Sequence, residues 1–331
     1  MNGSTDHSMF CNGEENSLTL TLSPQGRGEG TGSVHRANDT ASRSPSSDAN
    51  EERFGERTLV AMASCLILGL AAIAYGDSPP SETERSAHLE RMKQIAERFH
   101  VQVPRDGKHV SGKMVEKPLL RYNDSTRRLS DSTLWLWTER ELPCGLMAIE
   151  FYPKNPSGPQ WLFEFVSLSD ANLAIDRGND WKWGAKQSGL EWRPISNATE
   201  PSAKPTLRLT QAKQLFQRFA AHENEGVNGH IELRPLANPL YRYSDEASGV
   251  IDGVIFAFVN GTNPEVLLVI EARHDGGAKV PSWCYSLAQM TGAKVSASID
   301  DQEVWTQGEA DPPAVRSSYV NGWLPDAIEK K

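Results

Sequence analysis

Four polar residues with the potential for acid–base chemistry occur twice in this 331-residue chain, at a constant offset of 121 positions. Paired carboxylates can act as general acid and general base, and an arginine can orient an anionic or sugar substrate. On this interpretation the candidate catalytic residues are Asp124, Asp131 and Glu150. The complete set is Arg121, Asp124, Asp131 and Glu150 in the first copy, and Arg242, Asp245, Asp252 and Glu271 in the second.

The same residues also have a structural interpretation. Glu150 and Glu271 lie inside apolar stretches, where an unpaired carboxylate is costly. Each Glu is therefore expected to pair with the Arg of a neighbouring strand, while each Asp caps a turn. A duplicated enzyme commonly needs only one competent site, yet both copies keep all four residues. Retention favours a structural role or a binding site used twice, so we assign no catalytic residue.

The repeated residues belong to a longer internal duplication. PLLRYND at residues 118–124 recurs as PLYRYSD at residues 239–245. Trp183 aligns with Trp305 after one added residue. Near-constant register of this kind predicts two copies of a unit of roughly 100 residues, the usual size of a domain. Trp135 and Trp137 correspond to Phe256 and Phe258, which favours core packing of these rings over a sugar-binding platform.

Each unit is expected to begin with a helix and to continue as short strands. Apolar residues recur at helical spacing twice, and Ser81 with Glu84 has the spacing of a capping box. Short apolar runs separated by polar, Gly or Pro turns follow, which suits antiparallel neighbours. We predict an α+β fold of two tandem repeats, each a helix on an antiparallel meander, similar in outline to cystatin-like or NTF2-like folds. The two sets of helical residues are Leu89, Met92, Ala96 and Phe99, and Leu209, Ala212, Phe216 and Phe219.

The chain divides into six predicted regions. The N-terminal part reads as a disordered or mis-annotated extension followed by a signal peptide or anchor, because Leu59–Tyr75 has 17 uncharged residues after Arg57. We expect an exported protein, periplasmic or secreted, that touches a membrane only if this segment stays uncleaved. The boundaries are 1–56 for the extension, 57–75 for the signal peptide or anchor, 81–192 for unit one, 193–206 for a linker, 207–310 for unit two and 311–331 for a C-terminal tail.

Three stretches carry a resemblance to a known family. They are PLLRYND…LSDSTLWLW, PLYRYSD…DGVIFAFVNGTNPEVLLVIEA and PPAVRSSYVNGW. Through them the chain after the signal segment resembles an uncharacterised family of exported planctomycete proteins. The resemblance implies export and an internal repeat, and it implies no activity.

Motifs for common cofactor and hydrolase chemistry are missing from the sequence. It contains no Walker A loop and no GxGxxG, GxSxG or HExxH motif, and its histidines lack zinc-site spacing. A net charge of −9 leaves no basic footprint for nucleic acid. We therefore expect no cofactor, no metal and no nucleic-acid partner. Export would permit a bond between Cys144 and Cys284, whose redox state the sequence leaves open.

These observations favour a non-catalytic binding or scaffolding module of the periplasm or cell envelope, with an envelope protein or a glycan as its partner. The alternative is an exported glycan or peptide hydrolase that uses the Asp and Glu carboxylates. A third arrangement would place a ligand groove at the junction of the two units, with Tyr319 and Trp323 pinned across it.

Overall fold

The computed structural model describes residues 80–178, 181–225, 229–274, 280–309 and 318–324. By compactness the chain divides into Met1–Tyr75 and Gly76–Lys331, and every described residue belongs to the second unit. The predicted extension and the predicted signal peptide or anchor lie outside the described residues. Within the described part, no helix has the length and apolar character needed to cross a membrane.

Helix α1 (Glu82–Glu97) begins at the predicted capping box, which is confirmed. The Ser81 backbone N–H donates to Glu84 Oε2 over 2.7 Å, and the Glu84 N–H donates to Ser81 Oγ over 3.3 Å. These bonds satisfy backbone donors that the first turn of a helix otherwise leaves unpaired. The helix then buries Met92, Ile95 and Ala96.

Two antiparallel sheets accompany α1. The six-stranded sheet has the order β19-β7-β6-β5-β3, with β4 also paired to β5, and the four-stranded sheet has the order β2-β1-β8-β9. The strands of the first sheet are β3 (Lys113–Met114), β4 (Leu120–Asp124), β5 (Leu129–Glu139), β6 (Leu142–Tyr152), β7 (Gln160–Ser167) and β19 (Tyr319–Leu324). Those of the second are β1 (His100–Arg105), β2 (Lys108–Ser111), β8 (Ala174–Asp176) and β9 (Lys182–Gly184).

A nine-stranded antiparallel sheet accompanies the second helix, α2 (Pro205–Phe216). Its order is β10-β16-β15-β14-β12-β11-β17-β18, with β13 also paired to β14. A 3₁₀ turn, Glu246–Ser248, follows β13. The strands are β10 (Arg193–Pro194), β11 (Phe219–Glu225), β12 (Gly229–Pro235), β13 (Tyr241–Asp245), β14 (Val250–Asn260), β15 (Asn263–Arg273), β16 (Ser282–Gln289), β17 (Lys294–Ile299) and β18 (Gln302–Gln307).

The predicted α+β class is wrong, whereas the predicted antiparallel pairing is confirmed. Strands hold 54% of the described residues and helices 14%, and this part of the chain contains only two α-helices. The hairpins β1–β2 and β11–β12 enlarge the sheets after each helix, and β2 is exposed along its whole length. The predicted linker contributes β10, and the predicted tail contributes β19.

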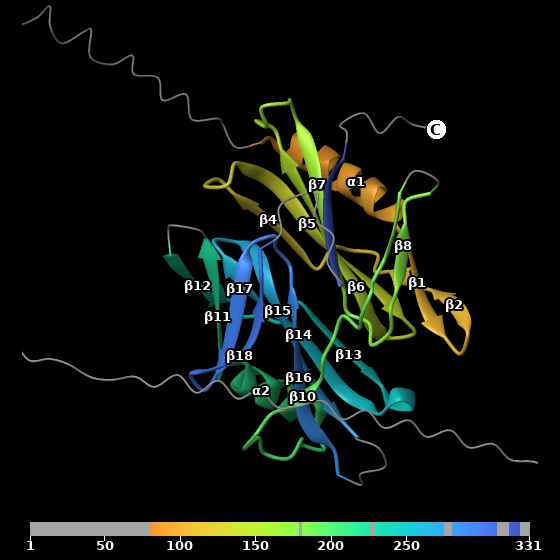
Figure 1. Cartoon of the computed structure of the whole chain (residues 1–331), viewed down its shortest axis with the longest axis vertical. Helices are drawn as coiled ribbons and strands as arrows, with labels where there is room; N and C mark the ends of the chain where they lie inside the picture. Colours follow the sequence, from red (N-terminus) through yellow and green to blue (C-terminus); the bar gives the residue numbers. More distant parts are fainter. Residues whose placement is uncertain (1–79, 179–180, 226–228, 275–279, 310–317, 325–331) are drawn as a thin grey trace, which may run out of the picture. The chain divides into compact units, whose positions relative to one another are not determined.

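The central strands bury both of their faces. Successive side chains of a strand point in opposite directions. On β5, Trp135 packs in one cluster with α1, whereas Leu134 packs in another cluster with Ile255 of β14. Phe256 faces the other way and stacks on Phe216 of α2 at 4.3 Å between ring centroids. The layers therefore run α1, six-stranded sheet, nine-stranded sheet, α2 (Figure 1).

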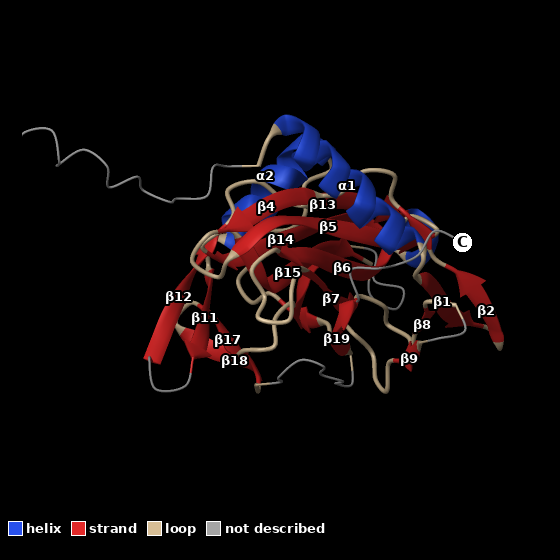
Figure 2. Cartoon of the chain, turned by 90° about the horizontal axis from the view of Figure 1, so that it is seen from above, coloured by secondary structure: helices blue, strands red, loops and turns tan. Residues whose placement is uncertain are grey.

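The predicted core role of the repeated aromatic residues is confirmed. Trp135 and Trp137 are 1% and 2% exposed, and their counterparts Phe256 and Phe258 are equally buried. Beyond this core, Figure 2 shows β1, β2, β8 and β9 on one side of the central strands and β11, β12, β17 and β18 on the other. The nine-stranded sheet thus continues beyond its central strands and ends at β18.

Candidate functional site

Two arginine–aspartate pairs fasten the helices to the sheets. Arg121 Nε lies 2.9 Å from Asp131 Oδ1, and Arg121 Nη2 lies 2.6 Å from Asp131 Oδ2. Arg242 holds Asp252 in the same bidentate way, at 2.8 and 2.6 Å. The two Nη2 atoms also donate to backbone carbonyls in the first turns of α1 and α2. These four predicted site residues therefore position helices, and their charged groups are already paired.

The predicted pairing of each Glu with the Arg of a neighbouring strand is wrong: Arg121 and Arg242 bind Asp131 and Asp252 instead. Glu150 accepts hydrogen bonds from the hydroxyls of Tyr122 at 3.0 Å and Tyr152 at 2.7 Å. Arg121 and Tyr122 are neighbours on β4 and so point to opposite faces of the sheet. Arg121 is on the α1 side, and Tyr122 is the residue that reaches the carboxylate.

The second copy repeats the tyrosine contact. Glu271 Oε1 accepts from the Tyr243 hydroxyl at 2.7 Å, and its Oε2 lies 3.2 Å from Arg273 Nη1. Glu150 and Glu271 are 1% and 3% exposed. Burial raises the pKa of Glu150, against the opposing effect of its two tyrosine bonds, and raises the pKa of Glu271 to about 7. Burial therefore favours the protonated form of both carboxyl groups, and internal donors contact their oxygens.

The two remaining predicted residues cap turns, as expected. Asp124 Oδ1 accepts from the backbone N–H of Thr126 at 2.9 Å, and Asp245 Oδ1 accepts from that of Ala247 at 3.2 Å. Such contacts are the ordinary role of Asp at the first position of a turn. The expectation that every Asp caps a turn is wrong for Asp131 and Asp252, which bind guanidinium groups instead.

A buried ionic cluster, which the sequence did not predict, joins residues of repeat unit one to residues of repeat unit two. Arg127 Nη2 lies 3.1 Å from Glu223 Oε2, and its Nη1 donates to Glu265. The two carboxylates are 1% and 0% exposed, and Asn260 Nδ2 adds a bond of 2.9 Å to Glu223. Burial raises the pKa of Glu265 to about 8, although Arg127 opposes the shift. The sequence contained one sign of this cluster, because Glu265 is a charged residue at the start of the apolar run PEVLLVIEA.

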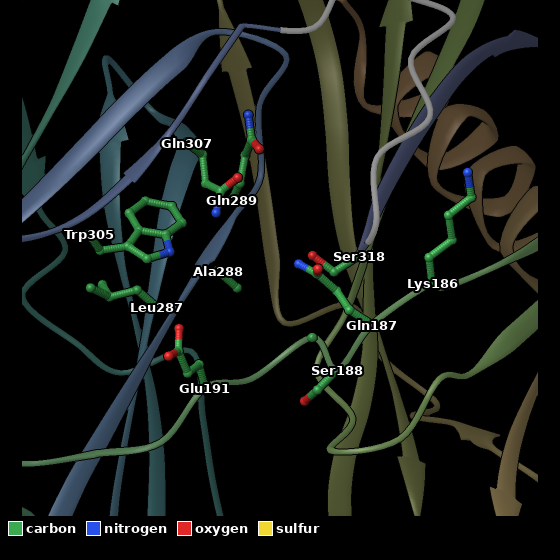
Figure 3. A pocket seen from close by; sticks show the side chains of 11 residues that line it. Lys186, Gln187, Ser188, Glu191, Leu287, Ala288, Gln289, Trp305, Gln307 and Ser318 are labelled. Carbon is green, nitrogen blue, oxygen red and sulfur yellow. The ribbon is translucent and has the colours of Figure 1, made fainter. Parts of the chain in front are cut away.

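A cleft of about 290 Å³ opens elsewhere, and none of the eight predicted residues lines it. Its walls come from four segments: the stretch after β9, strand β16, strand β18 and the residue before β19. Figure 3 shows Trp305 and Leu287 on one side and Gln187 and Ser318 on the other. The lining residues are Lys186, Gln187, Ser188, Gly189, Glu191, Leu287, Ala288, Gln289, Trp305, Gln307 and Ser318.

Side-chain amides dominate the polar lining of the cleft. Gln289 Nε2 donates to the carbonyl of Ala293 at 3.1 Å, which leaves its oxygen as an acceptor. Within the described chain, no hydrogen bond uses the side-chain amide of Gln187 or Gln307, and Figure 3 shows Gln307 beside Gln289. Glu191 is 80% exposed on its side chain and lies 3.1 Å from Arg193. The cleft thus offers uncommitted donors and acceptors beside an indole ring.

The cleft differs between the two copies of the repeat. Trp183, which the sequence aligns with Trp305, is 8% exposed and packs in the core beneath α1. Trp305 is only partly buried and lines the cleft. The sequence did not predict this difference, because the two tryptophans occupy matching positions in the repeat but have different surroundings in the structure.

Comparison of the chain with protein-family models, with curated proteins and with solved structures finds no match. Among the described residues, no three His, Cys, Asp or Glu side chains are grouped to hold a metal ion. Cys144 and Cys284 are not joined in a disulfide, and both are buried. Cys144 lies in β6, and burial raises its pKa to about 12, which suppresses the reactive thiolate.

Proposed function

We propose that this chain is an exported, non-catalytic binding module that holds a small polar ligand in the cleft between Trp305 and Gln187. The observation that carries the proposal is the lining itself: glutamine amides from both halves of the described chain face one space, without internal partners for Gln187 and Gln307. Small-molecule sites combine a concave surface with a few convergent polar groups. The cleft is lined by residues of repeat unit one and of repeat unit two, whereas Tyr319 and Trp323, which the third arrangement placed across a junction groove, do not line it.

The state of the carboxylates supports binding over catalysis. Two-carboxylate hydrolysis needs an acid and a base flanking one scissile bond, roughly 5 to 10 Å apart. Glu191 is the one carboxylate among the described residues that line the cleft. Asp124, Asp131 and Glu150, the candidates for a hydrolase, are engaged in a turn, an arginine pair and a tyrosine pair. The hydrolase alternative therefore has less support.

The proposal that the protein is exported rests on its sequence. The uncharged segment Leu59–Tyr75 follows Arg57, as in a secretory signal peptide. The resemblance to exported planctomycete proteins points to the same compartment. In the periplasm or cell envelope, a module of this kind would meet glycans and envelope proteins.

A thermal-unfolding screen of the purified chain tests this function. Sugars, short peptides, nucleotides and metal ions would be added singly, and a compound that binds the folded state raises the midpoint. We expect a hit that the variant Gln307→Trp loses, because a bulky ring fills the cleft. Gln302→Trp, exposed on the same strand outside the cleft, is the matched control. Turnover of any hit, or binding unaffected by Gln307→Trp, would overturn the proposal.

A further inference from the structure

We infer that the ligand of the cleft is a neutral carbohydrate of mono- or disaccharide size, an inference that rests on the proposed binding function. Small-molecule pockets commonly hold about 300 to 1,000 Å³. At about 290 Å³ the cleft stands at the lower end of this range, so a single sugar ring or a pair of rings matches it better than a polymer segment does.

The amide chemistry of the lining fits hydroxyl groups. A glutamine side chain presents two N–H donors and a carbonyl acceptor, and a sugar hydroxyl both donates and accepts. Gln187, Gln289 and Gln307 bring this pattern to the cleft from three separate segments, and Ser318 adds a hydroxyl, whereas the Ser188 hydroxyl donates to the Leu190 carbonyl within the chain. Because Gln289 Nε2 is fixed by Ala293, its oxygen is held as an acceptor rather than free to rotate.

The indole of Trp305 supplies the complementary apolar surface. It is partly buried against the core beneath α2, which holds its orientation, while part of the ring borders the cleft beside Leu287. A pyranose has one face made of C–H groups and an edge of hydroxyls. Aromatic rings bury such apolar faces at little cost in conformational freedom. The cleft therefore presents an apolar platform on one side and amides around it.

The charges at the cleft do not favour an ionic ligand. Lys186 and Glu191 have opposite signs, and Figure 3 shows the Lys186 side chain directed away from the space between Trp305 and Gln187. Glu191 is largely exposed and already close to Arg193. A phosphate or carboxylate would be expected to meet an arginine fork or converging backbone N–H groups. The described lining supplies no such group.

The test is a binding titration of the purified chain by calorimetry and saturation-transfer NMR with methyl glucoside, N-acetylglucosamine and cellobiose. Glucuronate and glycylglycine are the charged probes of similar size. We expect saturable binding of a neutral sugar, weakened about tenfold by Trp305→Ala and several-fold by Gln307→Ala. Trp305→Phe keeps an aromatic face, so it should retain most of the affinity. It therefore shows whether the loss in Trp305→Ala comes from the missing ring or from loss of folding. Trp323→Ala and Gln302→Ala, outside the cleft, should bind as the wild type does.

The outcomes separate this inference from the proposed function. If glucuronate or glycylglycine binds and Gln307→Trp abolishes that binding while neutral sugars fail, the carbohydrate inference is overturned and the binding function stands. If sugars bind equally to Trp305→Ala and wild type, the site assignment is wrong. If no probe binds, the inference fails, and the broader thermal screen then decides whether the binding function fails with it.

Discussion

The hydroxyl of Tyr243 lies 2.7 Å from Oε1 of Glu271, and both side chains are buried. Tyr122 and Glu150 make the same contact at 3.0 Å. In each copy the tyrosine lies on a short strand that pairs with the first of two long strands. The glutamate lies on the second long strand, so the hydrogen bond crosses over the first one. A buried carboxylate is costly without donors, and the conserved spacing of 28 residues supplies one in both halves.

Replacing Tyr243 with Phe should destabilise the protein by about 1 to 3 kcal/mol, because it removes a donor from a buried carboxylate. The phenyl ring still covers Gly253, against which the Tyr243 ring packs. Urea unfolding would measure the change. Tyr241→Phe, on the same strand and only partly buried, is the control. Equal stability of the two variants would contradict the proposed role of the hydroxyl.

Stability should fall as the pH rises from about 4.5 to about 7, through Glu271. Burial raises the pKa of this group from 4.5 to about 7. Within that window the folded state keeps a proton that the unfolded state has released, so rising pH favours unfolding. The contribution is about 3 kcal/mol across the window. Urea unfolding of Glu271→Gln at a series of pH values should show a correspondingly flatter profile.

The control for this pH dependence is Glu246→Gln, in the exposed turn after β13. It should keep the slope of the wild type. Parallel profiles for wild type and Glu271→Gln would show that Glu271 ionises in the folded protein as it does in the unfolded chain.

Replacing Arg127 with Met should be strongly destabilising, by about 3 to 5 kcal/mol, because it leaves Glu223 and Glu265 buried without their shared cation. The loss should be smaller at acidic pH, where the carboxyl groups can take up protons. Chemical unfolding at pH 5 and pH 8 would measure it. Arg128→Met, at the exposed neighbouring position, should have little effect. A loss independent of pH would point to packing rather than charge.

The two arginine–aspartate pairs should respond unequally to the same mutation. Among the residues that the structure describes, Arg121→Met leaves Asp131 with His88 alone, at 3.4 Å. Arg242→Met leaves Asp252 with Arg208, whose Nε stays 2.9 Å away. We therefore expect the Arg121 variant to lose more stability, by about 1 kcal/mol or more. Equal losses measured by thermal or urea unfolding would show that the second cation carries none of the interaction.

Local features of this fold could be predicted, and long-range register could not. The capping box of Ser81 and Glu84 depends on residues three apart, and the turns at Asp124 and Asp245 are equally local. The partner of Glu150 depends on which face of β4 each side chain occupies. The prediction paired Glu150 with an arginine, whereas the structure places Tyr122 on the face that reaches it.

The cleft was beyond prediction for a related physical reason. Gln187, Gln289, Trp305 and Gln307 come from segments whose proximity is created by sheet pairing. No spacing in the sequence relates them. Strands β2 and β12 were missed because exposed strands lack the apolar alternation that marks a half-buried strand. The class prediction failed for the same reason.

Strand β19 has a consequence for the order in which this protein can be assembled. Tyr319–Leu324 pairs with β7, whose partner residues Trp161–Val166 are made more than 150 residues earlier. Loop closure over such a distance makes pairing slow. A chain delivered from its N-terminus, whether by the ribosome or through a translocation pore, exposes the free edge of β7 until β19 arrives. An unpaired strand edge recruits other strands, so the edge of β7 needs protection from aggregation while the roughly 150 residues between β7 and β19 are delivered.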